Sequence, residues 1–412
     1  MSFVKKLKCV LCGTEYSPDE VTYTCPKCGY DGVLEVIYDY ERIKENFSLK
    51  KLKERSLNIW RYMELLPVEE KGTFPPLSIG WTPLYEVKRL REKLNLKNLF
   101  IKDDGKNPTA SLKDRASAVA VKKALERGAK AITTASTGNA ASSLAGISAS
   151  VGLPSFIFVP KTAPKAKIAQ LLVFGSTVFS VNGTYDDAFD LCIKASEEFG
   201  WYNRNTAFNP YTLEGKKTVS LEIWEQLGGK APDKVFVSVG DGVIYGGVYK
   251  GFYDLYALGL IDKIPEVIGV QAEDSAPIVK AFNEGKERVT PLKNPKTIAD
   301  SISVGIPRNG TMALKYARKW NGKFISVSDK EILSTIPFLG KLTGVFGEPA
   351  GVTGLAGLIK MLNEGKIDRD ETIVVIVTGN GLKDVESAMK SVGEPIIVEN
   401  SFEDVKRKIK NF

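Results

Sequence analysis

Short apolar runs rich in valine and isoleucine recur along this chain, and segments with helical character stand between them. Parallel strands need a crossover connection of a dozen or more residues, usually a helix, so this alternation predicts an α/β fold with parallel sheets. Seven runs have the length and composition of strands, at residues 99–102, 131–134, 156–159, 177–181, 235–239, 267–270 and 372–377.

One lysine, Lys113, stands where we expect the chemistry. It lies in the stretch 102–115, KDDGKNPTASLKDR, between a turn at residues 107–109 and a predicted helix at 114–127. A lysine at such a junction can reach a pocket, although most lysines at a helix start are only solvated. The chain has no histidine, which excludes Ser-His-Asp and Cys-His catalytic machinery. Acid–base chemistry then falls to lysine, aspartate, glutamate, tyrosine or a cofactor.

The residues around Lys113, Asn-Pro-Thr-x-Ser-x-Lys-Asp-Arg, resemble the lysine motif of fold type II (tryptophan synthase β-like) pyridoxal phosphate enzymes, and most closely that of the threonine synthase-like family. The resemblance implies that Lys113 is the catalytic lysine and binds pyridoxal 5'-phosphate covalently. It also implies two α/β domains with the cofactor in the cleft between them. We therefore expect a small domain at residues 106–205, which carries the lysine, and a large cofactor-binding domain formed by residues 39–105 and 206–412.

A polar loop, Ser136-Thr137-Gly138-Asn139, lies between a predicted strand and a predicted helix. Amides and hydroxyls at a helix N-terminus form an anion site, although Ser, Thr and Asn also favour such positions simply as caps. In the resembled family a loop of this kind binds the substrate carboxylate, which implies substrate contacts from Ser136, Thr137 and Ala140. Its asparagine, here Asn139, is implied to bind the ring oxygen of the cofactor.

A glycine loop follows the predicted strand 235–239 and precedes a helical segment. Such a loop can hold a phosphate with its backbone amides, but the pattern is weak when taken alone. It is not a dinucleotide fingerprint, because Tyr245 occupies the place of the third glycine in GxGxxG. The order of the motifs resembles that of the family, which implies a loop for the cofactor phosphate made of Gly240, Asp241, Gly242, Val243 and Ile244.

The last predicted strand leads into residues 378–384, TGNGLKD. This string is similar to the C-terminal signature of threonine synthases, whose threonine hydroxyl, here that of Thr378, pairs with the pyridine nitrogen of the cofactor. Residues 347–351, GEPAG, likewise resemble a segment of the family. The resemblance therefore covers residues 80–385.

Four of the five cysteines form two close pairs, and the second cysteine of each pair is followed by glycine. Four thiolates in this arrangement match a closed, structural zinc site, with two disulfides or unligated thiols as the alternatives. The resembled family includes chains with an N-terminal zinc ribbon, so residues 1–38 are expected to form one. Its zinc ligands would be Cys9, Cys12, Cys25 and Cys28, whereas we expect Cys192 in the core.

Two positions depart from the threonine synthase pattern. Thr212 stands where the family usually has an arginine that holds the phosphate of O-phosphohomoserine, and Asp241 stands where it usually has an asparagine. Two unit charges 4 Å apart interact by about 4 kcal/mol at an effective dielectric constant near 20. The lost arginine and the added carboxylate therefore argue against a phosphoester substrate.

The other polar positions of the family's substrate pocket are kept. Asn205 and Thr206 match them and are expected to bind substrate. Arg204, Lys216 or Lys217 would supply the missing positive charge for a phosphate if its side chain pointed into the substrate pocket.

These observations predict a pyridoxal-phosphate-dependent lyase of small L-amino acids. The altered phosphate contacts favour α,β-elimination of threonine or serine to a 2-oxo acid and ammonia, as in threonine dehydratase. The whole-chain resemblance favours the alternative, conversion of O-phosphohomoserine and water to L-threonine and phosphate. β-Replacement with a sulfur nucleophile is a third candidate. A zinc-ribbon binding module with an inactive enzyme body is a fourth, and the presence of Lys113, Asn139 and Thr378 argues against it.

The net charge of +8 comes from lysines interleaved with acidic residues, which is typical of a solvated surface rather than a nucleic-acid-binding one. No signal peptide, transit sequence or apolar run near twenty residues is visible, so a cytoplasmic enzyme without membrane contact is expected. Its partner is then a small amino-acid substrate. Active-site clefts of the resembled family usually belong to dimers, which implies a homodimer.

Overall fold

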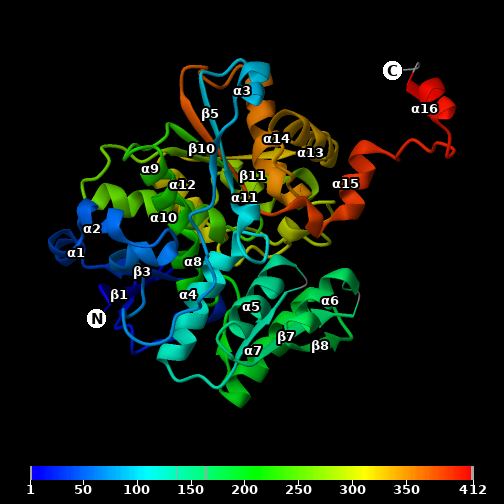
Figure 1. Cartoon of the computed structure of the whole chain (residues 1–412). Helices are drawn as coiled ribbons and strands as arrows, with labels where there is room; N and C mark the ends of the chain where they lie inside the picture. The colour runs from blue at the N-terminus through cyan, green and yellow to red at the C-terminus, as the bar shows by residue number, and fades with distance from the viewer. Residues whose placement is uncertain (1, 137, 162, 164, 410–412) are drawn as a thin grey trace.

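The computed structural model describes residues 2–136, 138–161, 163 and 165–409, and its largest sheet has six strands in the order β12-β11-β10-β13-β5-β4 (Figure 1). The strands are parallel except for β4, which pairs antiparallel with β5. Helical crossovers keep the others parallel, as the alternation in the sequence predicts. The strands are β4 (Leu84–Glu86), β5 (Asn98–Asp103), β10 (Lys234–Ser238), β11 (Glu266–Ala272), β12 (Lys323–Val327) and β13 (Thr372–Val377).

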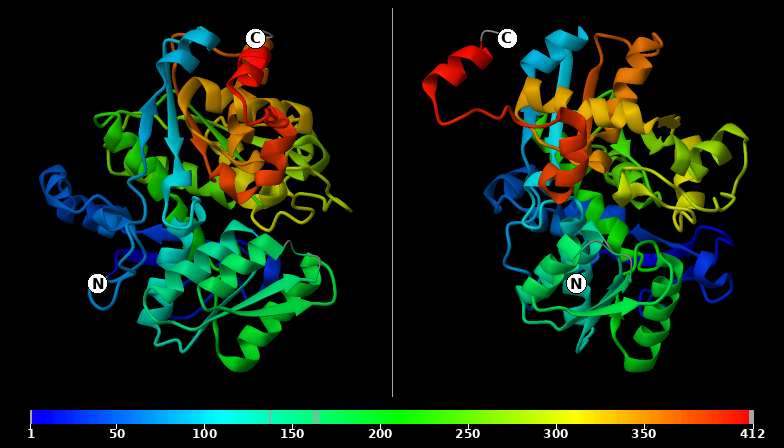
Figure 2. Two further views of the ribbon diagram at one scale, coloured as in Figure 1. Left: turned by 45° about the vertical axis from the view of Figure 1, so that its right-hand side comes forward. Right: turned by 90° about the vertical axis from the view of Figure 1, so that its right-hand side faces the viewer.

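Helices lie on both faces of this sheet and around its ends (Figure 2). The helices that follow the N-terminal sheet are α1 (Tyr40–Asn46), α2 (Leu49–Glu54), η2 (Ile59–Leu65) and α3 (Lys88–Leu94). Those of the main body are η3 (Asp104–Lys106), α4 (Lys113–Glu126), α8 (Tyr211–Lys216), α9 (Thr218–Gln226), α10 (Val243–Ala257), η4 (Glu273–Ser275), α11 (Pro277–Asn283), η5 (Asp300–Ile302), α12 (Gly310–Lys319), α13 (Asp329–Thr343) and α14 (Pro349–Asn363). The C-terminal ones are η6 (Gly381–Lys383), α15 (Val385–Val392) and α16 (Phe402–Ile409).

Alternate residues of β10 face opposite layers of helices. Val235 and Val237 belong to one hydrophobic cluster with residues of α9 and α10. Phe236, between them, belongs to a second cluster with residues of α13 and α14. A strand buried on both faces is apolar along most of its length, which explains the run at 235–239, where Ser238 is the one polar residue.

A second sheet of four parallel strands, in the order β8-β7-β6-β9, occupies the lower part of Figure 1. Its strands are β6 (Ile132–Ala135), β7 (Ser155–Pro160), β8 (Thr177–Val181) and β9 (Tyr202–Asn203). The helices α5 (Asn139–Ala149) and α6 (Lys165–Val173) share one cluster with this sheet, and α7 (Tyr185–Phe199) shares another. Cys192, on α7, is buried in that second cluster, where the sequence places it.

A third, antiparallel sheet of three strands is formed by β1 (Val4–Cys9), β2 (Glu15–Tyr16) and β3 (Leu34–Tyr38), with η1 (Gly29–Asp31) between the last two. The mixed α/β fold class predicted from the sequence is therefore confirmed, while the domain boundaries stay a prediction. Within the part of the chain that the structure describes, no helix is long and apolar enough to cross a membrane.

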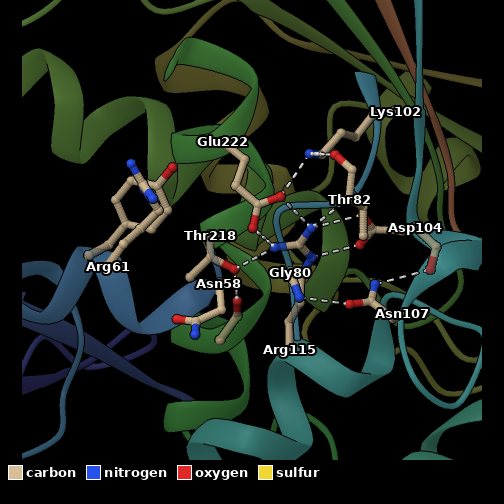
Figure 3. Close-up of polar contacts among 12 residues, drawn as sticks. Asn58, Arg61, Gly80, Thr82, Lys102, Asp104, Asn107, Arg115, Thr218 and Glu222 are labelled. Atoms are coloured by element: carbon tan, nitrogen blue, oxygen red, sulfur yellow. Dashed lines mark hydrogen bonds and ion pairs between the residues drawn. The ribbon is translucent and has the colours of Figure 1, made fainter. Parts of the chain in front are cut away.

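Arg115, in the first turn of α4, is fully buried and joins three segments of the large sheet's core (Figure 3). Its Nε donates to Asp104 Oδ2 at 2.7 Å, and its Nη2 donates to Glu222 Oε2 at 2.8 Å. Lys102 Nζ lies 2.7 Å from the same Glu222 oxygen. Burial alone would raise the pKa of Glu222, but Arg115 and Lys102 outweigh it and hold that pKa at about 2. Two buried cations thus neutralise two buried carboxylates.

Removing Arg115 should destabilise the fold strongly. Arg115→Leu leaves Asp104 and Glu222 buried with one cation fewer, and breaking a buried pair in this way typically costs about 3–5 kcal/mol. The free energy of unfolding from urea titration measures the loss. Arg91→Leu is the matched control, because Arg91 pairs with the exposed Glu86 and such surface pairs contribute at most about 1 kcal/mol. Equal losses for the two variants would contradict the role given to Arg115.

Candidate active site

Lys113 is the first residue of α4, and hydrogen bonds hold the chain on both sides of it. The Leu112 amide donates to the Thr378 carbonyl at 2.9 Å. The Thr109 amide donates to Asp114 Oδ2 at 2.7 Å, and the Thr109 hydroxyl donates to the other oxygen of that carboxylate. The turn before the helix is therefore locked to its first residues, and the predicted Thr378 loop lies beside the lysine.

A cavity of about 730 Å³ lies at the carboxyl ends of β6 and β10. Open parallel sheets bind ligands at this edge, and the volume is within the range of small-molecule sites. Six residues predicted from the sequence line the cavity: Lys113, Ser136, Asn139, Ala140, Thr206 and Asp241. Thr137 lies outside the described residues.

The predicted glycine loop forms the turn from β10 into α10. Gly242 has a φ of +92°, which L side chains rarely adopt, and it is the N-cap of α10. The Val243 amide donates to Asp241 Oδ1 at 3.0 Å, and Ile244 follows it in the first turn of the helix. A side chain at Gly240 would come within 3.1 Å of the backbone of η5. Backbone amides at the start of a helix fit a phosphate group.

Asn205 is held against the end of β6 rather than in the cavity lining. Its Oδ1 accepts hydrogen bonds from the Ala135 amide at 2.7 Å and from the Thr134 hydroxyl at 3.0 Å. Its Nδ2 is buried and has no partner among the described residues. Asn205 therefore positions the loop that carries Thr206, and it keeps one donor free.

Asn139 is tied to the GEPAG segment. Its Nδ2 donates to Glu348 Oε1 at 2.5 Å. Burial raises the pKa of Glu348, although Asn139, Lys383 and Lys113 act against that rise. The family segment at 347–351 thus meets the helix start that carries Asn139.

Two cations named only as alternatives in the sequence lie at the cavity. Arg204 lines it and is fully buried, and its Nη2 has no hydrogen-bond partner within the ranges that the structure describes. Lys216 is also buried, and its Nζ donates to the cavity residue Thr206 at 3.3 Å. Lys217, the next residue, points elsewhere, since its Nζ lies 2.6 Å from Asp254 Oδ2. Besides Lys113, one buried basic side chain, Arg204, therefore lines the cavity, and a second, Lys216, lies directly behind Thr206.

The position of the missing arginine explains why Lys216 is at the site. Thr212 is buried in α8, and its hydroxyl donates to the Asn209 carbonyl at 2.8 Å. Residues four apart on a helix lie on the same face, so Lys216 stands one turn beyond Thr212 on that face. The basic side chain that the resembled family usually has at position 212 is therefore present here at position 216, as Lys216.

The charges of the cavity do not balance. Burial lowers the pKa of Lys113, with Asp241 and Glu348 opposing and Arg204 adding to the effect. Burial also lowers the pKa of Lys216, far below its ordinary value; Asp241 opposes, while Lys113 and Arg204 lower it further. For Asp241, burial alone would raise the pKa, but Lys216, the hydrogen bond from the Val243 amide and Lys113 outweigh it, and the pKa lies below the ordinary value. A bound anion would relieve the repulsion among the three cations.

Two more cavity residues carry no signal in the sequence. Tyr185 comes from the start of α7, and Arg308 comes from the irregular segment 291–308 that forms much of the opposite wall. Arg308 lies over the Phe189 ring, 4.8 Å from its centroid. No motif marks that segment, so only the structure brings it to the site.

The four N-terminal cysteines lie together. Their sulfur atoms are all within 4.8 Å of one another, and Cys12 Sγ is 3.7 Å from Cys25 Sγ. Four thiolates around one zinc ion at about 2.3 Å would be about 3.8 Å apart, so the donor set and spacing fit a closed tetrahedral site. In the predicted ribbon, residues 1–38, the thiols of Cys9, Cys12, Cys25 and Cys28 could together hold one structural zinc ion.

The ribbon packs directly behind the segment 203–214, which carries the predicted substrate residues. Val33 shares a hydrophobic cluster with Ala207, Leu213 and Val243. The Tyr23 hydroxyl accepts from the Asn203 amide at 2.8 Å, and the Tyr38 hydroxyl donates to a Glu214 oxygen at 2.8 Å. The N-terminal segment that carries the cysteine cluster thus supports one wall of the cavity.

The residues around the cavity fit pyridoxal phosphate. A lysine of lowered pKa is available to bind its aldehyde, and the amides at the start of α10 are suited to its phosphate. Thr378, whose carbonyl accepts from the residue before Lys113, brings a hydroxyl group to the same region.

Comparison with known proteins agrees with this chemistry. Residues 76–379 match the family described as "Pyridoxal-phosphate dependent enzyme". The threonine synthase of Methanocaldococcus jannaschii is 41% identical over 404 residues, which cover 98% of this chain and 99% of that protein. The threonine synthase of Methanosarcina acetivorans is 43% identical over 406 residues, covering 98% of each. A solved structure, the processed form of threonine deaminase isoform 2 from Solanum lycopersicum, has a TM-score of 0.65 and 25% identity, covering 76% of this chain and 87% of its own.

Loss of the metal should loosen the cavity wall as well as the ribbon. Chelation, or Cys12→Ser, removes the constraint on the loops that support Val33, and the segment 203–214 then loses its packing partner. Hydrogen exchange followed by mass spectrometry should be at least about tenfold faster in both regions, as expected for local unfolding, and unchanged in α14. Purified protein without metal, or exchange confined to the ribbon after chelation, would count against this support.

Proposed function

The chain belongs to the family of pyridoxal-phosphate dependent enzymes and is a lyase of that family, and we propose that it converts O-phosphohomoserine and water to L-threonine and phosphate. Two archaeal relatives named threonine synthase, each similar over nearly the whole chain, support this proposal. They favour it over the elimination reaction that the altered residues Thr212 and Asp241 suggest from sequence.

The observation that carries the proposal is the pair of buried basic side chains, Arg204 in the cavity lining and Lys216 behind the lining residue Thr206. The start of α10 already offers backbone amides for the cofactor phosphate, and the start of α5 offers them for a carboxylate. Threonine and serine have no further negative charge, so two more desolvated cations would serve no purpose with them. A substrate that carries a phosphate group at its far end gives both cations a partner.

The chain's own residues can be assigned to the steps of this reaction. Pyridoxal phosphate, when bound, draws electrons from the carbons next to the substrate amine. Lys113, whose pKa is lowered by burial, would take and return protons beside the reacting carbons. Ser136 and Ala140 would orient the carboxylate at the start of α5. Arg204 and Lys216 would stabilise the phosphate as its C–O bond at Cγ breaks, before a water oxygen bonds to Cβ.

Elimination from threonine or serine is the second candidate. Asp241 favours it, because a buried carboxylate beside a phosphate is repulsive. Lys216 argues against elimination, because it offsets the charge of Asp241. Among the described residues, Arg204 and Lys113 then have no acidic partner in an ion pair and remain available for a phosphate. We rank elimination below the phosphoester reaction for that reason.

We further propose that the enzyme acts as a cytoplasmic homodimer. A reducing compartment suits a site of four thiolates, which an oxidising one would convert to disulfides. In the region that the structure describes, the five cysteines are free thiols.

A substrate panel on the purified holoenzyme tests the proposal. O-phosphohomoserine should give threonine and phosphate in equal amounts, with kcat/KM at least about a hundredfold above that for ammonia release from threonine or serine. Lys113→Ala should abolish both activities and the visible absorption of the bound cofactor. Efficient ammonia release from threonine, with no threonine formed from the phosphoester, would overturn the proposal in favour of elimination.

Lys216→Met should selectively weaken binding of the phosphoester. Losing a charged hydrogen-bond partner costs about 1.5–3 kcal/mol, so KM for O-phosphohomoserine should rise roughly 10- to 100-fold. Inhibition by inorganic phosphate should weaken in parallel, while Lys216→Arg retains most of both. Lys360→Met is the control, because the Lys360 amine donates to Ser326 on the far side of the sheet. An unchanged KM in Lys216→Met would remove Lys216 from the phosphate site.

A further inference from the structure

The last residues of the chain leave the body of the protein. Residues 393–401 run in an extended path from α15 to α16, which stands apart from the rest of the molecule in Figures 1 and 2. Within the described residues, each hydrogen bond and ion pair of residues 394–409 has both partners inside that segment. We call residues 394–409 the arm.

The arm carries apolar side chains that no other part of the described chain covers. Ile397 is 83% exposed and Phe402 is 71% exposed. Ile396, Val398 and Ile409 are exposed as well, and no residue of α16 is buried. Single exposed apolar residues are ordinary, but a contiguous series of this kind marks an interaction surface.

The helix at the root of the arm has an exposed apolar face of its own. Val385, Met389 and Val392 are spaced four and three residues apart on α15, so they lie on one side of the helix. Leu382, just before that helix, is 72% exposed. One chain therefore has two uncovered apolar elements, joined by the extended residues 393–401.

We propose that the arm of one chain docks on the α15 face of a second copy, and that the two copies exchange arms about a twofold axis. An isologous contact requires that each copy supply both the arm and its acceptor, and this chain has both. The extended linker has nine residues, which can span at most about 30 Å, enough to cross to a neighbouring copy.

Charge also favours a second copy as the partner. The whole chain carries a net charge of +8, so two copies repel each other in general. Residues 382–412 contain six basic and six acidic residues and are neutral. Contact through this part of the chain avoids the like-charge repulsion, whereas a strongly acidic or basic partner would find no net opposite charge there.

The exchange would also connect the two active sites. Lys383, next to the exposed Leu382, donates from Nζ to Ser142 Oγ at 2.9 Å, on the helix that begins with Asn139. The loop that starts at Thr378 leads directly into this region. The partner's arm would thus cover the outer side of the loop beside Lys113.

Sedimentation velocity of the holoenzyme tests the proposal. The full chain should sediment as a dimer at micromolar concentration. A chain that ends at Gly393, and the full-length double variant Ile397→Asp/Phe402→Asp, should each raise the dimer dissociation constant at least 100-fold, with unchanged circular dichroism. Val173→Asp, an equally exposed valine on α6, is the matched control and should change it less than twofold.

Cross-linking of a mixture of isotope-labelled and unlabelled chains identifies the acceptor. A photo-reactive group at position 397 should form links between labelled and unlabelled chains, at residues 382–392. A monomeric full chain, an unchanged dissociation constant in both variants, or links found only within one chain would overturn the exchange.

Discussion

The buried ion network around Arg115 fixes the place of the reactive lysine. Residues two apart on a helix point to nearly opposite sides, so Lys113 can face the cavity while Arg115 enters the core. Between them, Asp114 binds the Thr109 amide and fixes the turn. Because Arg115 joins the carboxylates of Asp104 and Glu222, the start of α4 is tied to the end of the large sheet. Three consecutive residues thus serve the chemistry, the turn and the core.

Much of the fold follows from local sequence, and the exceptions have physical causes. The run at 372–377 coincides with β13, because a continuous apolar β-branched run bounded by turns is typical of a buried strand. β12, an edge strand with exposed and half-buried positions, lacks that continuous apolar signal. β9 has two residues and depends on its pairing with β6, which no local pattern specifies. Lys113 was expected just before its helix and is its first residue, a difference within the usual uncertainty of helix ends.

The residues of the candidate site also fall into two groups, those that local sequence predicts and those that only packing places. Ser136, Asn139 and Asp241 belong to contiguous loops at strand ends, and parallel strands bring such loops to one edge. Arg204 and Lys216 reach the cavity from separate segments, and their role depends on which way each side chain turns. Lys217 illustrates the limit, since it directly follows Lys216 at the end of α8 but pairs with buried carboxylates away from the cavity. Sequence could offer these cations as alternatives, and only packing selects between them.

A carboxylate at position 241 is consistent with a phosphate site once Lys216 is taken into account. Without a ligand, Lys113, Arg204 and Lys216 would lie together in a desolvated cavity, and their repulsion would oppose folding. Asp241 lowers that repulsion, and its own depressed pKa shows that the cations in turn stabilise its charge. A neutral asparagine beside an arginine that is charged at any ordinary pH would keep the grip stronger but leave the unliganded site less stable. A basic side chain at position 216 instead of 212, together with Asp241, therefore weakens phosphate binding but stabilises the unliganded site. The site still has more basic than acidic side chains.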